Sequence, residues 1–409
     1  MDRSRHAALF LAALACGVAA GCGGSDAPAA VALTPGPSPS PSPAPTPAPL
    51  PTPSPSPTPA PPLAPSPTPA PPTVDICPTT SGRTLQVGPG KTYATPSAAA
   101  AVAQSGDRIL IDPVDYRGDV ATWSAANLTI CGNGGRARLY ADGKNAQGKG
   151  TWVIAAPNSA TTTIVNVQFH DSKVPDKNGA GIRHEGGNLV LRNTGFFDNE
   201  NGILGGGGPV TVTIERSEFA RNGYGDGYSH NIYIGNVDRL RVVASWFHEA
   251  KIGHNLKSRA KENIVENSYF MDGPTGTSSY LLDFPDGGVV FLRGNLLHKG
   301  TMADNTTAVA YGAERNMWTT NTVTLTHNTL VTTMGRGTFI SLAGYTQQAT
   351  LTANLFAGNA ALASGIAAPT LVQQNNVMTG EGNVPGAATG NFWPTAAIQP
   401  QLVLATVPD

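Results

Sequence analysis

Hydrophobic and polar residues alternate in short stretches that recur from about residue 160 to residue 360. Each copy has alternating apolar positions, then a polar turn that contains Asn, then an aromatic residue or Leu. The copies end at Phe169, Phe197, Phe219, Phe247, Phe270, Leu297, Leu330 and Phe356. Their separations range from 22 to 33 residues, so a common strand pattern carries loops of different lengths. A unit of this size without a helical period is typical of stacked coils in a solenoid.

This repeat predicts an all-β fold, a right-handed parallel β-helix. Each coil would bury its apolar face on its neighbours, with the final aromatic residue stacked inside. The 47 glycines and the Asn-rich turns suit the left-handed and tight conformations that each corner needs. Ahead of the repeats, Thr95-Pro96-Ser97 opens an Ala-rich stretch that ends at Gly106, which predicts a short helix capping the first coil. The region after Asn375 is the candidate cap at the other end.

The first 73 residues predict export and a spacer. Arg3 and Arg5 precede an apolar run from Ala7 to Ala20, too short to span a bilayer, which predicts a signal peptide over residues 1–21. The run ends in the letters AAGC, which resemble the lipobox of bacterial lipoproteins. That resemblance implies an acylated Cys22 that anchors the protein in the membrane; an ordinary cleaved signal with an incidental Cys is the alternative.

Residues 22–73 are rich in Pro, Ser, Thr and Ala, which predicts a disordered linker ahead of a β-helix domain at residues 74–409. We therefore expect an exported protein, anchored to the outer membrane on its periplasmic or outer side, or secreted. Because disulfides persist in such compartments, Cys77 and Cys131 are candidates to pair. The net charge of −1, with 13% charged residues, favours neither nucleic-acid binding nor a strongly charged surface, and we expect a monomer.

A second alignment, on the strand ahead of each repeat, predicts a file of outward side chains. The middle apolar residue of each strand would point inward, so the next residue points outward, about 4.8 Å from its neighbour in the adjacent coil. The expected file is Arg183, Leu204, Tyr233, Lys257 and Asp283. By the same parity, Asn231 and Asn255 would form a neighbouring outward file, and His230 and His254 would stack where the chain enters these strands.

Six cations with one acid lie in a short window around this file, which predicts a basic patch of charge +5 that holds an acidic polymer. The acid is Glu249, and the cations are Arg239, Arg241, Lys251, Lys257, Arg259 and Lys261. A solvated loop is the alternative interpretation of the same window.

One segment consists of the letters KS at Lys257, then Asn263, then the letters NSYF at 267–270. It resembles the region around the catalytic lysine in the β-helical lyases related to chondroitinase B and alginate lyase. The resemblance implies a polysaccharide lyase in which the lysine takes the proton beside a uronate carboxylate. An arginine one coil later would assist, and Ca²⁺ would neutralise the carboxylate. Here Asp283 stands where that arginine is expected, and Ala250 and Ile252 stand where the family has acidic calcium ligands.

β-Elimination needs a base at the C5 proton, a cation on the carboxylate and an acid for the leaving oxygen. Two assignments fit the residues: Lys257 is the base with Arg259 on the carboxylate, or Lys257 neutralises charge while Tyr233 or His254 moves protons. Tyr233 is equally suited to stack on a sugar ring. The candidate substrate-binding residues are Arg183, His230, Asn231, Asn255 and Asp283; alternatively, Asp283 simply pairs with Lys257.

Three other functions fit the same fold. A glycoside hydrolase needs two carboxylates about 5 to 9.5 Å apart, and Asp283 has only Asp286 and Glu185 as distant partners in sequence. An epimerase on the same fold is another candidate. A non-catalytic polysaccharide-binding or adhesion lipoprotein explains the anchor, the spacer and the basic patch equally well.

Overall fold

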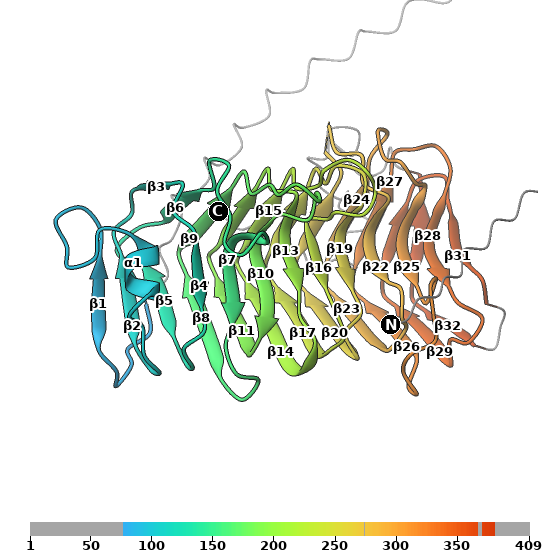
Figure 1. Cartoon of the computed structure of the whole chain (residues 1–409). Coiled ribbons are helices and arrows are strands. Elements are labelled where there is room, and N and C mark those ends of the chain that lie inside the picture. The colour runs from blue at the N-terminus through green and yellow to red at the C-terminus, as the bar shows by residue number, and fades with distance from the viewer. Residues whose placement is uncertain (1–76, 274, 367–369, 381–409) are drawn as a thin grey trace, which may run out of the picture. The chain divides into compact units, whose positions relative to one another are not determined.

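The computed structural model describes residues 77–273, 275–366 and 370–380, and all of them belong to one compact unit of the chain. These residues form a right-handed parallel β-helix built from three long parallel sheets, which we call A, B and C (Figure 1). The chain passes from A to B to C in each coil and then returns to A. The signal peptide, Cys22 and the linker lie outside the described residues. Within those residues, no helix has the length and apolar character to cross a membrane.

Sheet A contains twelve strands in chain order. They are β1 (Thr84–Val87), β2 (Arg108–Ile111), β5 (Thr129–Gly132), β8 (Thr161–Val165), β11 (Asn188–Arg192), β14 (Gly208–Glu215), β17 (Val237–Val243), β20 (Glu262–Glu266), β23 (Val289–Arg293), β26 (Thr322–Thr326), β29 (Gln348–Thr352) and β32 (Leu371–Gln374).

Sheet B contains eleven short strands. They are β3 (Asp115–Arg117), β6 (Ala137–Tyr140), β9 (Val167–His170), β12 (Gly195–Phe197), β15 (Glu218–Ala220), β18 (Trp246–His248), β21 (Tyr269–Met271), β24 (Leu296–Lys299), β27 (Thr329–Thr332), β30 (Leu355–Ala357) and β33 (Val377–Thr379).

Sheet C contains ten strands and carries the predicted file of outward residues. They are β4 (Ala121–Trp123), β7 (Gly150–Ala155), β10 (Ala180–Gly186), β13 (Asn201–Gly205), β16 (Ile232–Ile234), β19 (His254–Ser258), β22 (Tyr280–Phe284), β25 (Thr307–Tyr311), β28 (Thr338–Leu342) and β31 (Ala361–Ser364).

Aromatic rings from sheet B form a stack along the inside of the solenoid. Phe169, Phe196, Phe219, Phe247 and Phe270 are fully buried, with successive ring centroids 4.5 to 5.0 Å apart. The sequence alignment was wrong by one residue at Phe197, which points outward. Alternation in β12 explains the error, because its single inward position falls on Phe196, in register with Phe169 and Phe219.

Asparagine acts at the corners in two ways. Asn166, Asn193 and Asn267 adopt the left-handed conformation that the sequence predicted for the turns. Other asparagines form a buried ladder at the corner between sheets A and B, where each side-chain oxygen accepts the backbone N–H of the coil before it. The ladder runs through Asn295, Asn328, Asn354 and Asn376. These bonds satisfy amides that turn away from the strands, so they stabilise the stack.

A one-turn helix, α1 (Pro96–Ala100), packs at the N-terminal end of the solenoid (Figure 1). Thr95 is its N-cap, with Oγ1 accepting the N–H of Ala98, and Ala99 is fully buried in the core. The helix therefore covers the interior of the first coil as predicted. It ends at Ala100 rather than near Gly106, because Gly106 belongs to a later turn with φ of +82°.

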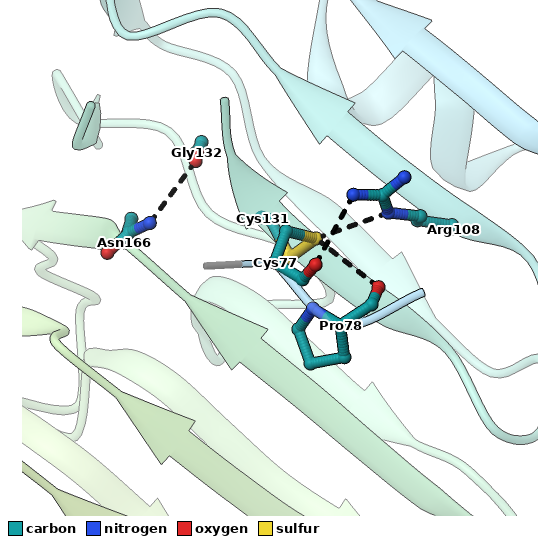
Figure 2. The surroundings of a disulfide bond; sticks show 6 residues. All are labelled: Cys77, Pro78, Arg108, Cys131, Gly132 and Asn166. Carbon is teal, nitrogen blue, oxygen red and sulfur yellow. Dashed lines mark hydrogen bonds between the residues drawn. A yellow bond between two sulfur atoms is a disulfide. The ribbon is translucent and has the colours of Figure 1, made fainter. Parts of the chain in front are cut away.

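A disulfide joins the start of the described chain to the solenoid (Figure 2). Cys77 bonds to Cys131 on β5, 54 residues away, with the Cα atoms 5.8 Å apart. Arg108 on β2 donates to the carbonyl oxygen of Cys77 at 3.3 Å. Cys131 lies on the outer face of sheet A, where Leu110 and Val165 pack beside it. The bond therefore holds the entering chain against the first coils.

Replacement of Cys131 by Ser should lower the stability of the β-helix unit. A crosslink that closes a loop of this length contributes up to about 4 kcal/mol by restricting the unfolded chain. We expect a lower midpoint of denaturant unfolding for Cys131→Ser, and the same decrease for the unaltered protein in reductant. A reductant that lowers the midpoint of Cys131→Ser further would contradict the assignment of the effect to this bond.

Candidate active site

The register of sheet C confirms the predicted file of outward residues. Consecutive strands pair Arg183 with Leu204, Leu204 with Tyr233, Tyr233 with Lys257 and Lys257 with Asp283. Strands β16, β19 and β22 lie next to one another in Figure 1. Parallel strands repeat at about 4.8 Å, so the side chains of Tyr233, Lys257 and Asp283 are close enough to interact.

Lys257 lies between two carboxylates. Its Nζ is 3.2 Å from Oδ2 of Asp283 on the next coil and 2.7 Å from Oε1 of Glu314. Asp283 is buried, with 2% of its side chain exposed, whereas 45% of the Glu314 side chain is exposed. The pairing of Lys257 with Asp283 is therefore not the surface ion pair considered from the sequence.

Arg259 bonds to three groups around the same point. Its Nε donates to Oη of Tyr233 at 2.7 Å, its Nη1 donates to Asp286, and its Nη2 donates to Glu314. Asp286 is fully buried and also accepts from Arg315 at 2.7 Å. We refer to these residues as the charge cluster: Tyr233, Lys257, Arg259, Asp283, Asp286, Glu314 and Arg315.

The charge cluster keeps its lysine and arginine protonated. Burial by itself would lower the pKa of Lys257, but the charge of Asp283 and the hydrogen bond to Glu314 outweigh it and raise that pKa. The pKa of Arg259 is raised by its bonds to Glu314 and Tyr233 against the same opposing effect of burial. Burial would raise the pKa of Glu314, but hydrogen bonds from Lys257 and Arg259 lower it, so Glu314 is ionised.

Two histidines lie directly beneath the cluster. The rings of His230 and His254 stack at 4.7 Å, as the sequence predicted. Nδ1 of His254 accepts the N–H of Tyr280, which leaves the ring proton on Nε2, 3.2 Å from Asp283. Nδ1 of His230 accepts the N–H of His254, and burial lowers the pKa of His230 well below 6.5, so its ring is neutral. Both rings act within the scaffold of the site.

A depression of about 560 Å³ opens beside the cluster. It is lined by Gly206, Tyr233, Gly235, Asn236, Arg259, Glu314 and Arg315. Tyr233 and Arg259 thus face a space open to solvent, which we call the groove. The four candidate catalytic residues, Tyr233, His254, Lys257 and Arg259, are brought together, but only Tyr233 and Arg259 line the groove.

Most of the predicted substrate-binding residues do not reach the groove. Asn231 and Asn255 are fully buried, because they form a second internal ladder in which Asn231 Nδ2 donates to Oδ1 of Asn255 at 2.7 Å. The parity argument was wrong for them: Asn231 comes directly before β16 and Asn255 is the second residue of β19, and both side chains are enclosed. His230 is 3% exposed, and Asp283 is held beneath Lys257. Arg183 lies three coils from Lys257, about 14 Å along the file.

The predicted basic patch of charge +5 was also wrong. Arg239 and Arg241 extend from β17 on sheet A, where Arg239 bonds to Glu262 at 2.6 Å and Arg241 to Glu215 and Glu266. Lys251 pairs with Asp198 at 3.6 Å. Counting charges along the sequence missed these acids because they lie on neighbouring coils, outside the window. The cations therefore do not form one surface.

Sequence reasoning missed Glu314 and Arg315 and treated Asp286 as distant. Glu314 and Arg315 lie in the loop between β25 and β26, which interrupts the repeat. Glu314 is 57 residues from Lys257 along the chain. The sequence signal for this coil is its length, because the separation from Leu297 to Leu330 is the longest in the repeat. That separation indicates an inserted loop, but it does not show which of the loop residues contact Lys257.

The residues of the site do not fit the Ca²⁺ that the family resemblance implied. Ala250 is fully buried and Ile252 is apolar, and each carboxylate of the cluster bonds to a cationic side chain. Among the described residues, no group of three or more His, Cys, Asp or Glu side chains converges as metal ligands would.

Replacement of Asp283 by Asn should lower the pKa of Lys257 relative to the unaltered protein. The negative charge of Asp283 is the largest effect that raises this pKa, and an amide cannot replace it. Nuclear magnetic resonance titration of the Lys257 side chain measures the change. Asp112→Asn, which alters the carboxylate beside Lys91, is the matched control and should leave the titration unchanged. An unchanged Lys257 titration in Asp283→Asn would contradict this account.

Comparison with known proteins does not assign the chain to a family. No family model matches the chain, and no curated protein matches it. Among solved structures it is similar to the crystal structure of pectate lyase Pel9A, with 16% sequence identity and a TM-score of 0.49 over 71% of this chain and 79% of that chain. The fold is assigned here from strand order and register. The resemblance to the lyases related to chondroitinase B and alginate lyase stays an interpretation of the sequence.

Proposed function

We propose that this protein is a polysaccharide lyase that cleaves a uronate-containing glycan by β-elimination in the groove beside Tyr233. In this reaction a base takes the C5 proton, and the electron pair forms the C4–C5 double bond. The C4–O bond then breaks, and the leaving oxygen takes up a proton. The site must supply a group that moves protons and cations that stabilise the charge developing on the uronate carboxylate.

The hydrogen bond from Arg259 to Tyr233 is the observation that carries this proposal. Arg259 Nε donates to the phenolic oxygen at 2.7 Å, so a cation stabilises the negative charge that the oxygen acquires when it gives up its proton. Because the phenolic oxygen accepts this bond, its own proton is available to another acceptor. Tyr233 also lines the groove. In its deprotonated form Tyr233 is placed to take the C5 proton, and it then returns that proton to the leaving oxygen.

The geometry supports Lys257 as a cation rather than as the base. Its pKa is raised, so the neutral amine needed for proton abstraction is even rarer than in free lysine. His254 is also poorly placed, since both of its ring nitrogens face protein atoms and 9% of its side chain is exposed. Of the two role assignments open from the sequence, these contacts favour proton transfer by Tyr233 with charge neutralisation by Lys257.

Hydrolysis is supported less well, although the structure brings Asp283, Asp286 and Glu314 closer than the sequence suggested. A glycoside hydrolase needs one protonated carboxylic acid next to the scissile oxygen. Glu314 is held ionised by Lys257 and Arg259. Asp283 and Asp286 are buried beneath their cationic partners. None of the three is placed to donate a proton in the groove.

We also propose that the protein acts outside the cytoplasm, anchored through Cys22 and held away from the membrane by the linker. The apolar leader, the lipobox-like AAGC letters and the Pro-rich composition of residues 34–73 support this proposal. The Cys77–Cys131 disulfide is consistent with an oxidising compartment. A spacer of this length suits a bulky or immobile glycan.

Tyr233→Phe should reduce turnover about a hundredfold or more, because it removes the proton-transfer group but keeps the ring. The assay incubates the protein with a panel of uronate polymers and follows ultraviolet absorbance from unsaturated ends alongside reducing sugar. Tyr224→Phe is the matched control, since Tyr224 is exposed and does not line the groove. Lys257→Ala should abolish turnover and also lower thermal stability, because buried Asp283 loses its cationic partner.

Each pattern of products has one interpretation. Unsaturated ends that depend on Tyr233 support the lyase. Reducing ends without absorbance would indicate a hydrolase, and binding without either product would indicate a non-catalytic module. Full activity in Tyr233→Phe would remove this residue from the mechanism.

A further inference from the structure

Two of the three cations of the charge cluster are partly buried, and each of them has a buried acidic partner. Lys257 pairs with Asp283, and Arg259 pairs with Asp286. Exposed side-chain fractions are 2% for Asp283 and 0% for Asp286, so these acids lie beneath the cations on the protein side. These two pairs hold the lysine and the arginine in place. Glu314 is an additional acid that neither cation needs for its position.

Glu314 binds the cations in the manner of a ligand. Its Oε1 lies 2.7 Å from Nζ of Lys257, and its Oε2 accepts from Nη2 of Arg259. One carboxylate thus spans the two cations. The side chain of Glu314 is 45% exposed, against 12% for Lys257 and 14% for Arg259. It therefore covers the solvent side of both cations, where a substrate would arrive.

The charges of the cluster balance only when one carboxylate occupies this position. Lys257, Arg259 and Arg315 contribute +3, whereas Asp283 and Asp286 contribute −2. Glu314 brings the total to zero. When its side chain leaves, the partly buried cations retain one unmatched positive charge, which favours another anion at the same place. A neutral sugar cannot restore that balance.

The loop that carries Glu314 is anchored through its backbone. The N–H groups of Glu314 and Arg315 donate to the carbonyl oxygen of Pro285 at 3.0 and 3.1 Å, and Tyr345 Oη donates to the carbonyl oxygen of Arg315 at 2.6 Å. Rotation of the exposed Glu314 side chain therefore suffices to uncover the cations, without movement of the loop. Such rotations are fast compared with turnover.

We propose that Lys257 and Arg259 form a carboxylate subsite, and that the side chain of Glu314 fills this subsite until a uronate carboxylate displaces it. The choice of a uronate as ligand rests on the proposed lyase function, whereas the subsite itself rests on the contacts above. Displacement makes the site selective. An acidic sugar replaces the bonds that Glu314 gives up, but a neutral or esterified sugar leaves the cluster with one unmatched positive charge.

Glu314→Gln should bind acidic oligosaccharides about tenfold more tightly, because the ligand no longer competes with an internal carboxylate. Titration calorimetry with hexamers of galacturonate, mannuronate and glucuronate, and with their methyl esters, measures the change. The acidic forms should gain affinity, and the esters should not. Glu314→Ala is a second variant that removes the residual amide contact and should show the same gain.

Glu262→Gln is the matched control, since Glu262 is a part-exposed glutamate paired with Arg239 on sheet A. It should leave every affinity unchanged. In turnover assays Glu314→Gln should lower KM with little change in kcat. Unchanged or weaker binding of all acidic hexamers by both Glu314 variants, with thermal stability retained, would overturn the subsite.

The subsite and the lyase can fail separately. Tighter binding of acidic hexamers by Glu314→Gln, with no unsaturated product from any variant, would uphold the subsite and overturn the lyase. Unsaturated product from the unaltered protein, with KM unchanged in Glu314→Gln, would uphold the lyase and overturn the role of Glu314. An equal gain for acidic and esterified hexamers would also overturn the subsite, because it would show steric blocking rather than competition between carboxylates.

Discussion

The in-register stacking of parallel coils is the constraint on which the rest of this structure depends. Backbone hydrogen bonds hold adjacent strands about 4.8 Å apart, and alternation sends each side chain either into the core or outward. The inward positions of sheet B stack Phe169 through Phe270 in one file. The same register on sheet C stacks Tyr233, Lys257 and Asp283. One spacing thus sets both the core and the site.

The site combines this rigid file with one irregular loop. Asp283 and Asp286 are buried beneath Lys257 and Arg259, so each cation has a fixed position before any ligand arrives. Buried ion pairs of this kind contribute little net stability, but they define the geometry of the groups that they hold. Glu314 on the β25–β26 loop then covers the cations from the solvent side. In the proposed mechanism, the buried acids hold the two cations in place, and Glu314 competes with the ligand from the solvent side.

Such an arrangement also explains why the lysine does not act as the base in the proposed mechanism. Two carboxylates raise the pKa of Lys257, which suits a group that neutralises charge. Tyr233 instead accepts a hydrogen bond from Arg259 at its phenolic oxygen and lines the groove. The proposed mechanism thus divides proton transfer and charge neutralisation between neighbouring coils.

The sequence alone determined the features that depend on local periodicity. Alternation and the repeat predicted the β-helix and the file from Arg183 to Asp283, and the Thr95-Pro96-Ser97 cap predicted the helix, because each of these depends on residues that are close together in the sequence. What only the tertiary structure decided depends on where each strand begins and which strand it pairs with. Asn255, near the start of β19, joins a buried ladder, and Phe196 rather than Phe197 takes the inward position of β12. Glu314 likewise reaches Lys257 across 57 residues, because loop length and direction set that contact and no periodic pattern encodes them.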